Sequence, residues 1–68
     1  MKKSELTQGA VYKDKWSETL YQFLGVNEYG DYEFAEVEYN KTRDAYSYVD
    51  SDYSIFLDTF AIADLERA

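Results

Sequence analysis

The sequence predicts a small, mainly β domain, either a barrel or a strongly bent antiparallel sheet, with a short C-terminal helix. Short runs rich in tyrosine, phenylalanine and valine alternate with turns that carry glycine, asparagine or aspartate. The 68 residues include no cysteine and no histidine, so neither a disulfide framework nor a Cys/His zinc site is there to stabilise the fold. Aromatic residues make up 19% of the chain, and their large buried area suits a compact core in so small a domain. We therefore expect one domain over residues 1–68, in which residues 1–8 are a flexible N-terminal arm.

Four strands are expected in the first 49 residues. They are a strand that begins within residues 9–12 and strands at 19–26, 32–39 and 45–49, with turns at 27–31, 40–44 and 50–52. The second strand is apolar on both alternating faces, which is typical of a central strand. In the last of them, Tyr46 and Tyr48 share a face because alternate residues of a strand point the same way.

The C-terminal segment, residues 53–68, combines two patterns. An alternating strand pattern gives way to apolar residues at helical spacing. We expect a short strand followed by a helix that is capped by Asp58 or Thr59 and runs to Arg67, where a base suits a helix C-terminus. A longer helix from Ser54 is the main alternative.

Residues 16–25 also fit a helix, with Ser17 as its cap and Gly25 as its C-terminal stop. If this helix forms, the fold becomes a small α+β domain with a β-hairpin and two helices. The two predictions differ in the structure of these ten residues.

The glycine, tyrosine and leucine spacings carry a resemblance to a known fold. They are Gly9-x-x-Tyr12, Leu20-Tyr21-x-x-Leu24-Gly25-Val26 and a closing Leu57-x-x-Phe60. This layout resembles the small SH3-like barrel domains of bacterial and phage proteins over most of the chain. The resemblance implies a fold, and it assigns no functional residue.

The strand expected at residues 32–39 lies within the acidic segment DYEFAEVEYN. Strict alternation in this segment would place carboxylates on both faces of the sheet. A β-bulge at residues 34–35 would restore one buried face. The bulged strand points Tyr32, Phe34 or Ala35, Val37 and Tyr39 inward, and Glu33, Glu36 and Glu38 outward.

The net charge of −7 is concentrated in the middle of the chain. Residues 28–58 hold nine acids against Lys41 and Arg43 alone. Direct binding to nucleic acid is not expected, because such binding depends on lysine and arginine neutralising phosphates. No apolar run has the length of a signal peptide or a membrane span, so we expect a cytoplasmic protein with no membrane partner, located in the host cytoplasm if it is phage-encoded.

No catalytic or metal-binding pattern is found, so we expect no enzyme activity and no cofactor. Glu36 and Glu38 are expected on an exposed face, which does not suit an acid/base pair. Asp50-Ser51-Asp52-Tyr53-Ser54 resembles the start of a calcium loop, but Ile55 replaces the turn glycine and Ala61 replaces the closing glutamate. This stretch is more simply a solvated acidic turn.

The remaining functions are both forms of protein binding. The candidate partner-binding residues are Glu33, Glu36, Glu38, Tyr46, Tyr48, Asp50 and Asp52, because aromatic anchors bind partners and acids steer basic ones. One hypothesis is an inhibitor that presents its carboxylates as a phosphate or DNA mimic to a basic, nucleic-acid-binding protein. In size, charge and aromatic content the chain resembles small acidic phage proteins of the anti-restriction and anti-CRISPR type, without a shared motif.

The alternative hypothesis is a non-catalytic interaction module or structural subunit whose acidity keeps it soluble. One dense acidic face would favour the inhibitor, and a uniform spread of acids would favour the module. A homodimer formed through an exposed strand edge is compatible with either hypothesis.

Overall fold

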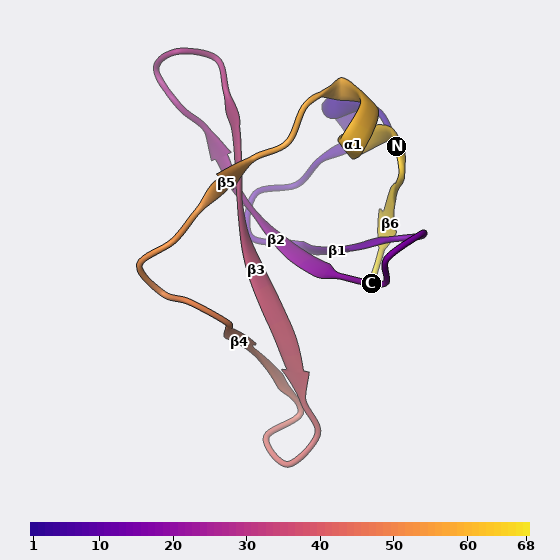
Figure 1. The fold of residues 1–68 in the computed structure, drawn as a ribbon, viewed down its shortest axis with the longest axis vertical. Helices are drawn as coiled ribbons and strands as arrows, with labels where there is room; N and C mark the ends of the chain where they lie inside the picture. Colours follow the sequence, from indigo (N-terminus) through magenta and orange to yellow (C-terminus); the bar gives the residue numbers. More distant parts are fainter.

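The computed structural model describes all 68 residues and confirms that the protein is mainly β. Its strands form one antiparallel sheet, and its single α-helix is short (Figure 1). The elements are η1 (Lys3–Glu5, a 3₁₀-helix), β1 (Val11–Asp14), β2 (Leu20–Val26), β3 (Tyr32–Asn40), β4 (Ala45–Tyr48), β5 (Ile55–Phe56), α1 (Thr59–Ala63) and β6 (Leu65–Arg67). The two-helix alternative is wrong, because residues 16–25 contain most of β2.

The sheet is open and does not close into a barrel. Its strand order is β4-β3-β2-β1-β6, and β5 pairs with β3 at Glu33 and Phe34, alongside the part of β3 that β4 leaves free. Because β4 and β6 do not pair with each other, each forms an edge of the sheet. The predicted barrel is therefore not formed, and the structure has an open antiparallel sheet.

The irregular point of the sheet lies in β2. The pairing with β3 shifts between Phe23 and Gly25, so Leu24 is the extra residue of a β-bulge. Gly25 has φ of 127°, a conformation that is open to glycine and strained for residues with a side chain. The prediction of a bulge at residues 34–35 is wrong, since β3 alternates without interruption.

The main core lies on one face of the sheet. It consists of Tyr12, Phe23, Phe34, Ile62 and Leu65, from β1, β2, β3, α1 and β6. The Phe34 side chain is fully buried, and its ring centroid lies 5.1 Å from that of Phe23. Complete burial of one such side chain contributes about 1.5–3 kcal/mol, so a few rings supply much of the stability of this domain.

A second, smaller buried region lies on the opposite face of β3. Ala35 and Val37 alternate with Phe34 along the strand and are buried as well. Val37 stands opposite Leu20 of β2 on one side and Tyr48 of β4 on the other. The middle of β3 therefore buries side chains on both faces, which explains why its sequence does not alternate simply between apolar and charged residues.

The N-terminal segment predicted to be a flexible arm, residues 1–8, lies against the domain. Met1 packs on the core, and its amino group donates a hydrogen bond to the carbonyl of Ala63 at 2.9 Å. The N–H of Thr7 donates to the hydroxyl of Tyr12 at 2.7 Å, which gives the polar tip of this fully buried side chain a partner. The segment is thus part of the packed structure.

The C-terminal helix begins as predicted and ends earlier. The Asp58 carboxylate accepts a hydrogen bond from the N–H of Ala61 at 2.9 Å, which is the geometry of an N-cap. The helix ends at Ala63 instead of running to Arg67, because β6 pairs with the free edge of β1 and so places Leu65 in the core. The predicted sequence of a short strand followed by a helix is confirmed, and β6 was missed.

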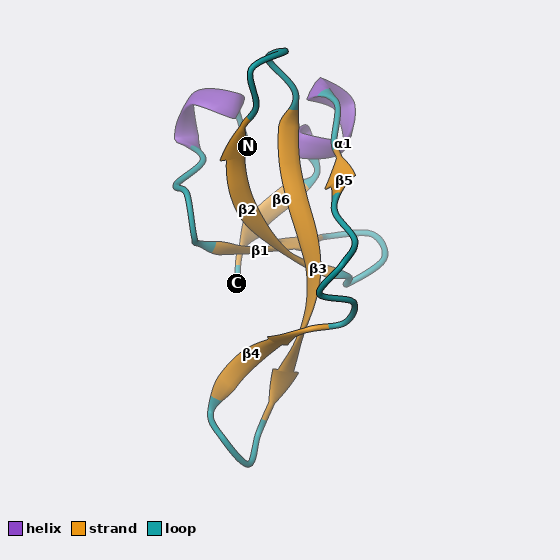
Figure 2. Ribbon diagram, turned by 90° about the vertical axis from the view of Figure 1, so that its left-hand side faces the viewer, coloured by secondary structure: helices purple, strands orange, loops and turns teal.

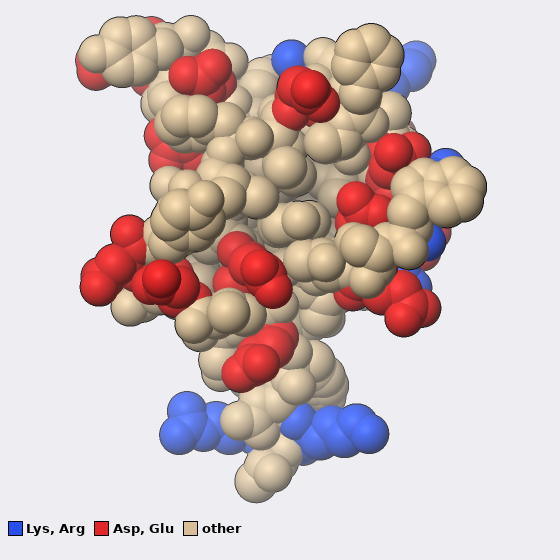
Figure 3. Space-filling model, viewed as in Figure 1, with Lys and Arg blue, Asp and Glu red and all other residues tan.

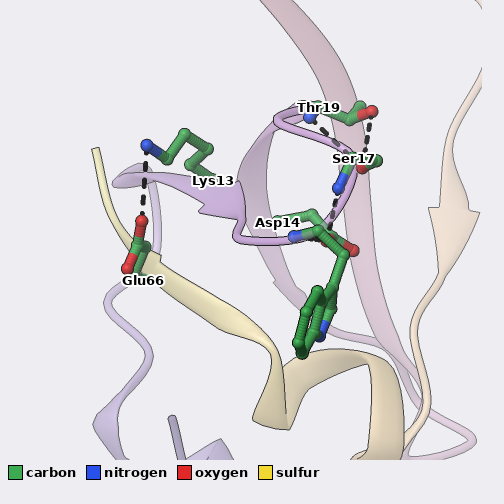
Figure 4. A network of polar contacts seen from close by, with 6 residues as sticks. Lys13, Asp14, Ser17, Thr19 and Glu66 are labelled. Atoms are coloured by element: carbon green, nitrogen blue, oxygen red, sulfur yellow. Dashed lines mark hydrogen bonds and ion pairs between the residues drawn. The ribbon is translucent and has the colours of Figure 1, made fainter.

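Polar contacts fix the turn between β1 and β2 and link β1 to β6 (Figure 4). The Asp14 carboxylate accepts hydrogen bonds from the N–H groups of Trp16 at 2.8 Å and Ser17 at 3.1 Å. On the neighbouring strands, the Lys13 ammonium lies 3.3 Å from the Glu66 carboxylate. These contacts hold the β1–β2 turn and the β6 edge of the sheet, and β2 begins after this turn at Leu20, opposite Val37 of β3.

Candidate functional site

The hairpin formed by β3 and β4 projects from the rest of the molecule (Figures 1 and 2). Its turn is organised by Asn40, whose side-chain oxygen accepts hydrogen bonds from the N–H groups of Thr42 at 3.0 Å and Arg43 at 3.2 Å. Asp44 closes the turn with φ of 51°, a left-handed conformation that aspartate tolerates better than most residues. Local side-chain contacts thus fix the direction in which the hairpin extends.

Alternation gives this hairpin two unlike faces. One face carries Tyr39, Tyr46 and Tyr48, and we call it the tyrosine face; Tyr39 stands directly opposite Tyr46. The other face carries Glu36 and Glu38, and we call it the carboxylate face. The predicted tyrosines and these two glutamates therefore point in opposite directions.

The tyrosine face is half exposed and well ordered by contacts. The exposed fractions of Tyr39, Tyr46 and Tyr48 are 45%, 46% and 50%. The ring centroids of Tyr39 and Tyr46 are 5.6 Å apart, and the Tyr39 hydroxyl donates a hydrogen bond to the Asp44 carboxylate. The Tyr48 hydroxyl donates to the side-chain oxygen of Gln22 at 2.6 Å. These contacts restrict the rings before any partner arrives.

A hollow of about 260 Å³ lies next to Tyr48, at the base of the hairpin. Its apolar wall comes from Leu24, Ala35, Tyr48 and Tyr53, and its polar rim comes from the loop after β4, including Asp52. The bulge residue of β2 thus contributes to this surface. The tyrosine face therefore continues into a concave region that is large enough for a side chain of another protein.

The structure does not assemble the predicted row of three acids. Glu36 and Glu38 are exposed on one face as predicted, but the uninterrupted alternation of β3 places Glu33 on the other face, where it is half buried between Gly25 of β2 and Phe56 of β5. The expected outward position of Glu33 depended on the bulge that β3 lacks. Only two of the three predicted strand carboxylates therefore share a surface.

Asp50 and Asp52 lie in the loop between β4 and β5, and both are exposed. The Asp50 carboxylate accepts a hydrogen bond from the N–H of Asp52 at 3.0 Å, so it organises its own turn. No three acids in the structure lie close enough to hold a metal ion together. Of the predicted site residues, Tyr46 and Tyr48 share one surface with Asp52 at the rim of the adjoining hollow, and Glu36 and Glu38 form another.

Basic and acidic side chains are distributed differently over the molecule. Figure 3 shows carboxylates scattered over the body and basic side chains both at edges of the body and on either side of the tip of the β3–β4 hairpin, whose turn carries Lys41 and Arg43. Lys13 and Lys15 pair with acids of the C-terminal segment, but neither base of the turn makes an ion pair within the chain. The visible face thus lacks a single dense acidic patch.

Two tyrosines have raised pKa values for different reasons. For Tyr21 in the body, burial is the main cause, and the negative charges of Asp14 and Glu36 add to it. For Tyr39 in the hairpin, the main cause is the hydrogen bond that its hydroxyl donates to Asp44. Both phenols therefore stay protonated at neutral pH. The negative charges of Asp14 and Glu36 both contribute to the raised pKa of Tyr21.

Tyr39 was not predicted to be part of the exposed surface. It was expected to point inward with Val37, and the two do share a face, but β2 pairs with β3 only as far as Val37. The signal that identifies Tyr39 is the hairpin register, because a turn between Asn40 and Ala45 places it opposite Tyr46. The two bases of the turn were not predicted to have a role either.

Comparisons with protein-family models, with curated proteins and with solved structures give no match to this chain. The resemblance to SH3-like barrel domains accordingly stays a prediction. No helix of the structure has the length and apolar character needed to span a membrane.

Proposed function

We propose that this protein is a non-catalytic protein-binding module whose partner contacts the tyrosine face of the β3–β4 hairpin. The observation that carries the proposal is the set of three half-exposed tyrosines on one side of a projecting hairpin, namely Tyr39, Tyr46 and Tyr48. Exposed aromatic rings are enriched among the residues that dominate binding energy, because each buries a large area with few rotatable bonds. A partner that covers these rings buries their apolar surface, and this burial stabilises the complex.

The contacts within the tyrosine face favour tight binding. The Tyr39 and Tyr48 hydroxyls are already held by Asp44 and Gln22, so a partner that covers the rings restricts little additional motion. The hollow beside Tyr48 offers a place for one apolar anchor of the partner. Rigid rings beside a concave region are the usual centre of a specific interface.

The charge of the protein favours a partner with a basic surface. With 14 acids and seven bases, its net charge of −7 attracts such a partner over about a Debye length, roughly 10 Å at 0.1 M salt. This attraction raises the association rate, whereas the tyrosines determine how long the complex lasts. Acids spread over the body serve this purpose without forming a specific site.

Mimicry of nucleic acid is the second candidate function, and one observation favours it. Glu36 and Glu38 are exposed on the same face with no base paired to them. The pKa of Tyr21, which burial raises most, is raised further by the negative charges of Asp14 and Glu36. Alternate side chains of a strand stand roughly 6.6–6.8 Å apart, about two phosphate steps along one DNA strand. Against this candidate, Glu33 lies on the other face, and two bases occupy the tip of the same hairpin.

A capture experiment separates the two candidates. The immobilised protein is exposed to an extract of the cells that produce it, and bound proteins are identified for the wild type and for Tyr46→Ala/Tyr48→Ala. The matched control is Tyr29→Ala/Phe60→Ala, which removes two rings that are 81% and 84% exposed on other elements. The module predicts that the hairpin variant loses its partner at least about tenfold in affinity and that the control does not.

The carboxylate variant Glu36→Gln/Glu38→Gln provides the opposing test. If this variant loses the partner, and if nucleic acid competes with the wild type for it, the mimic is correct and the module is wrong. Retention of the partner by the tyrosine variant overturns the proposal in either case. Far-ultraviolet circular dichroism of each variant checks that the sheet is intact.

A further inference from the structure

The outer edge of β4 has unpaired backbone groups. β4 is the last strand on its side of the sheet, and three of its four residues are exposed. The N–H of Val49 donates to the carbonyl of Glu36 at 3.1 Å, which shows which residues of β4 direct their backbone groups toward β3. Because hydrogen-bonded pairs alternate along an antiparallel ladder, Ser47 bonds toward β3, whereas the N–H and C=O groups of Tyr46 and Tyr48 point outward.

We propose that a second copy of this chain pairs with this edge, so that two β4 strands run antiparallel about a twofold axis at Ser47. In this register Tyr46 of one copy stands opposite Tyr48 of the other, and each pair exchanges two backbone hydrogen bonds. These are the residues whose N–H and C=O groups point outward. The two sheets then form one continuous sheet, and neither copy keeps an exposed β4 edge.

Charge complementarity identifies the second copy as the occupant of the edge. Antiparallel pairing of β4 brings the turn before the strand, which carries Lys41 and Arg43, alongside the loop after the strand in the other copy, which carries Asp50 and Asp52. None of these four residues makes an ion pair within its own chain. The symmetry repeats this match at both ends of the paired strands, so an attraction between turn and loop occurs twice.

The acid in the same turn does not cancel this match. Asp44 stands opposite Asp50 of the other copy in this register and keeps its negative charge while it accepts the hydrogen bond from Tyr39 of its own chain, but with Lys41 and Arg43 the turn still carries a net charge of +1 against −2 for the loop. The turn therefore meets the loop with two free bases, and the loop presents Asp50 and Asp52, both of which are exposed. The local attraction opposes the general repulsion of two acidic chains, which salt near 0.1 M screens beyond about 10 Å.

The dimer goes beyond the proposed function, because it uses the strand edge and leaves the tyrosine face exposed. Tyr46 and Tyr48 of the two copies lie side by side on one face of the joined sheet. Together with Tyr39 of each copy, they form a surface of six rings. The dimer thus doubles the area that the proposed module offers to a partner.

A charge-swap experiment tests the arrangement of the two copies. Sedimentation equilibrium at about 0.1 M salt is expected to show a monomer–dimer equilibrium for the wild type between about 10 µM and 1 mM. Lys41→Glu/Arg43→Glu and Asp50→Lys/Asp52→Lys each place like charges at both contacts and are expected to weaken the dimer about thirtyfold or more. An equimolar mixture of the two variants restores opposite charges at both ends, so it is expected to form heterodimers of near wild-type strength.

A pair of substitutions at Tyr46 tests the backbone contact. Tyr46→Ala and Tyr46→Pro both remove the ring, but only the proline variant also removes the outward N–H group. Since symmetry removes two hydrogen bonds, the proline variant is expected to dimerise about tenfold or more weakly than the alanine variant, with unchanged circular dichroism. Proline at Ser47 is the control, because its N–H bonds toward β3 and its loss is expected to damage the hairpin itself.

Three results overturn the dimer. They are a wild type that remains monomeric at 1 mM, charge variants that dimerise like the wild type, and a mixture of the two charge variants that stays monomeric. The capture experiment with Lys41→Glu/Arg43→Glu separates this outcome from the proposed function. If that monomeric variant still captures the partner through its tyrosine face, the module stands without the dimer.

Discussion

The two ends of β3 have similar residues and opposite surroundings. At its start, Tyr32 lies in the body, where its ring stacks on Phe23 with centroids 5.9 Å apart and the Lys3 ammonium lies 4.8 Å from its ring centroid. Near its end, the ring of Tyr39 lies tilted against that of Tyr46 in the projecting hairpin and is half exposed. Tyr32 lies on the core face of the sheet, which α1 and the N-terminal segment cover, whereas Tyr39 lies on the opposite face, in the part of the hairpin that projects beyond the body (Figures 1 and 2).

This difference shows that the burial of a tyrosine or glutamate in β3 depends on the strands and segments that surround it, and not on the residue type alone. Up to Val37 the strand has neighbours on both sides, and its apolar residues are buried on both faces. Beyond Val37 only β4 remains as a neighbour. Stability is therefore expected to come from the body, whereas the hairpin is free to present its residues to other molecules.

The largest expected difference between the two regions is in the effect of removing a ring. Phe34→Ala is expected to lower the free energy of unfolding by about 3–5 kcal/mol, because Phe34 is fully buried in the main core. Tyr39→Ala removes a half-exposed ring and is expected to cost about 1 kcal/mol. Urea unfolding followed by tyrosine fluorescence measures both, and equal losses would contradict the division into body and hairpin.

A charge at the boundary of the two regions is expected to have the next largest effect. Val37→Asp places an unpaired carboxylate in the second buried region, between Leu20 and Tyr48, and is expected to cost about 2–4 kcal/mol. Glu36→Gln, one residue earlier on the exposed face, is expected to stay within about 0.5 kcal/mol of the wild type. A similar loss in both variants would show that the register of β3 is wrong.

The sequence was sufficient to predict most of the elements. Aromatic runs and turn residues indicated the strands, and Asp58 identified the start of α1, because both are local signals. The bulge was placed in the wrong strand because the sequence was interpreted with one buried face. Once Val37 and Phe34 are buried on opposite faces, β3 needs no bulge, and the irregularity falls at Gly25, where the backbone conformation requires glycine.

The candidate site was predictable only in its parts. Alternation within β4 is local, so Tyr46 and Tyr48 were correctly placed on one face. The placement of these rings and of Glu36 and Glu38 on opposite faces was not predicted, since it depends on the pairing register of β3 with β4. β6 was missed for the same reason, because its partner is the edge of β1, more than 50 residues away in the sequence.

Loss of the N-cap of α1 is expected to lower the free energy of unfolding by less than the two core substitutions do. The effect is confined to α1, which packs on the body and not on the hairpin. Asp58→Ala removes the acceptor for the N–H of Ala61 and is expected to cost about 1 kcal/mol. Asp52→Ala also removes one acid, in an exposed loop beside the hairpin, and is expected to change stability by less than about 0.5 kcal/mol. Thermal unfolding of the two variants compares them, and an equal effect would mean that the cap contributes no more than general charge.

The smallest expected effect is in the titration of the two perturbed tyrosines, one from each region. The pKa of Tyr21 is raised mainly by burial in the body, and the pKa of Tyr39 is raised mainly by its hydrogen bond to Asp44 in the hairpin. A raised pKa in the folded state means that the native protein holds its proton more tightly than the unfolded chain. The stability from these groups is therefore complete below pH 10.0, the value for an unperturbed tyrosine, and is lost as the pH rises through the folded pKa values.

Two substitutions test which groups raise the pKa of each tyrosine. Asp44→Asn keeps a residue that tolerates the left-handed conformation but removes the charge, so it is expected to lower the pKa of Tyr39 and leave that of Tyr21 unchanged. Glu36→Gln is expected to lower the pKa of Tyr21 slightly, since burial remains its main cause, and to leave Tyr39 unchanged. Nuclear magnetic resonance of the ring signals from about pH 9 to 12 measures each tyrosine separately. If Asp44→Asn moves both tyrosines equally, or neither of them, the hydrogen bond does not set the pKa of Tyr39, and the hairpin is less independent of the body than its structure indicates.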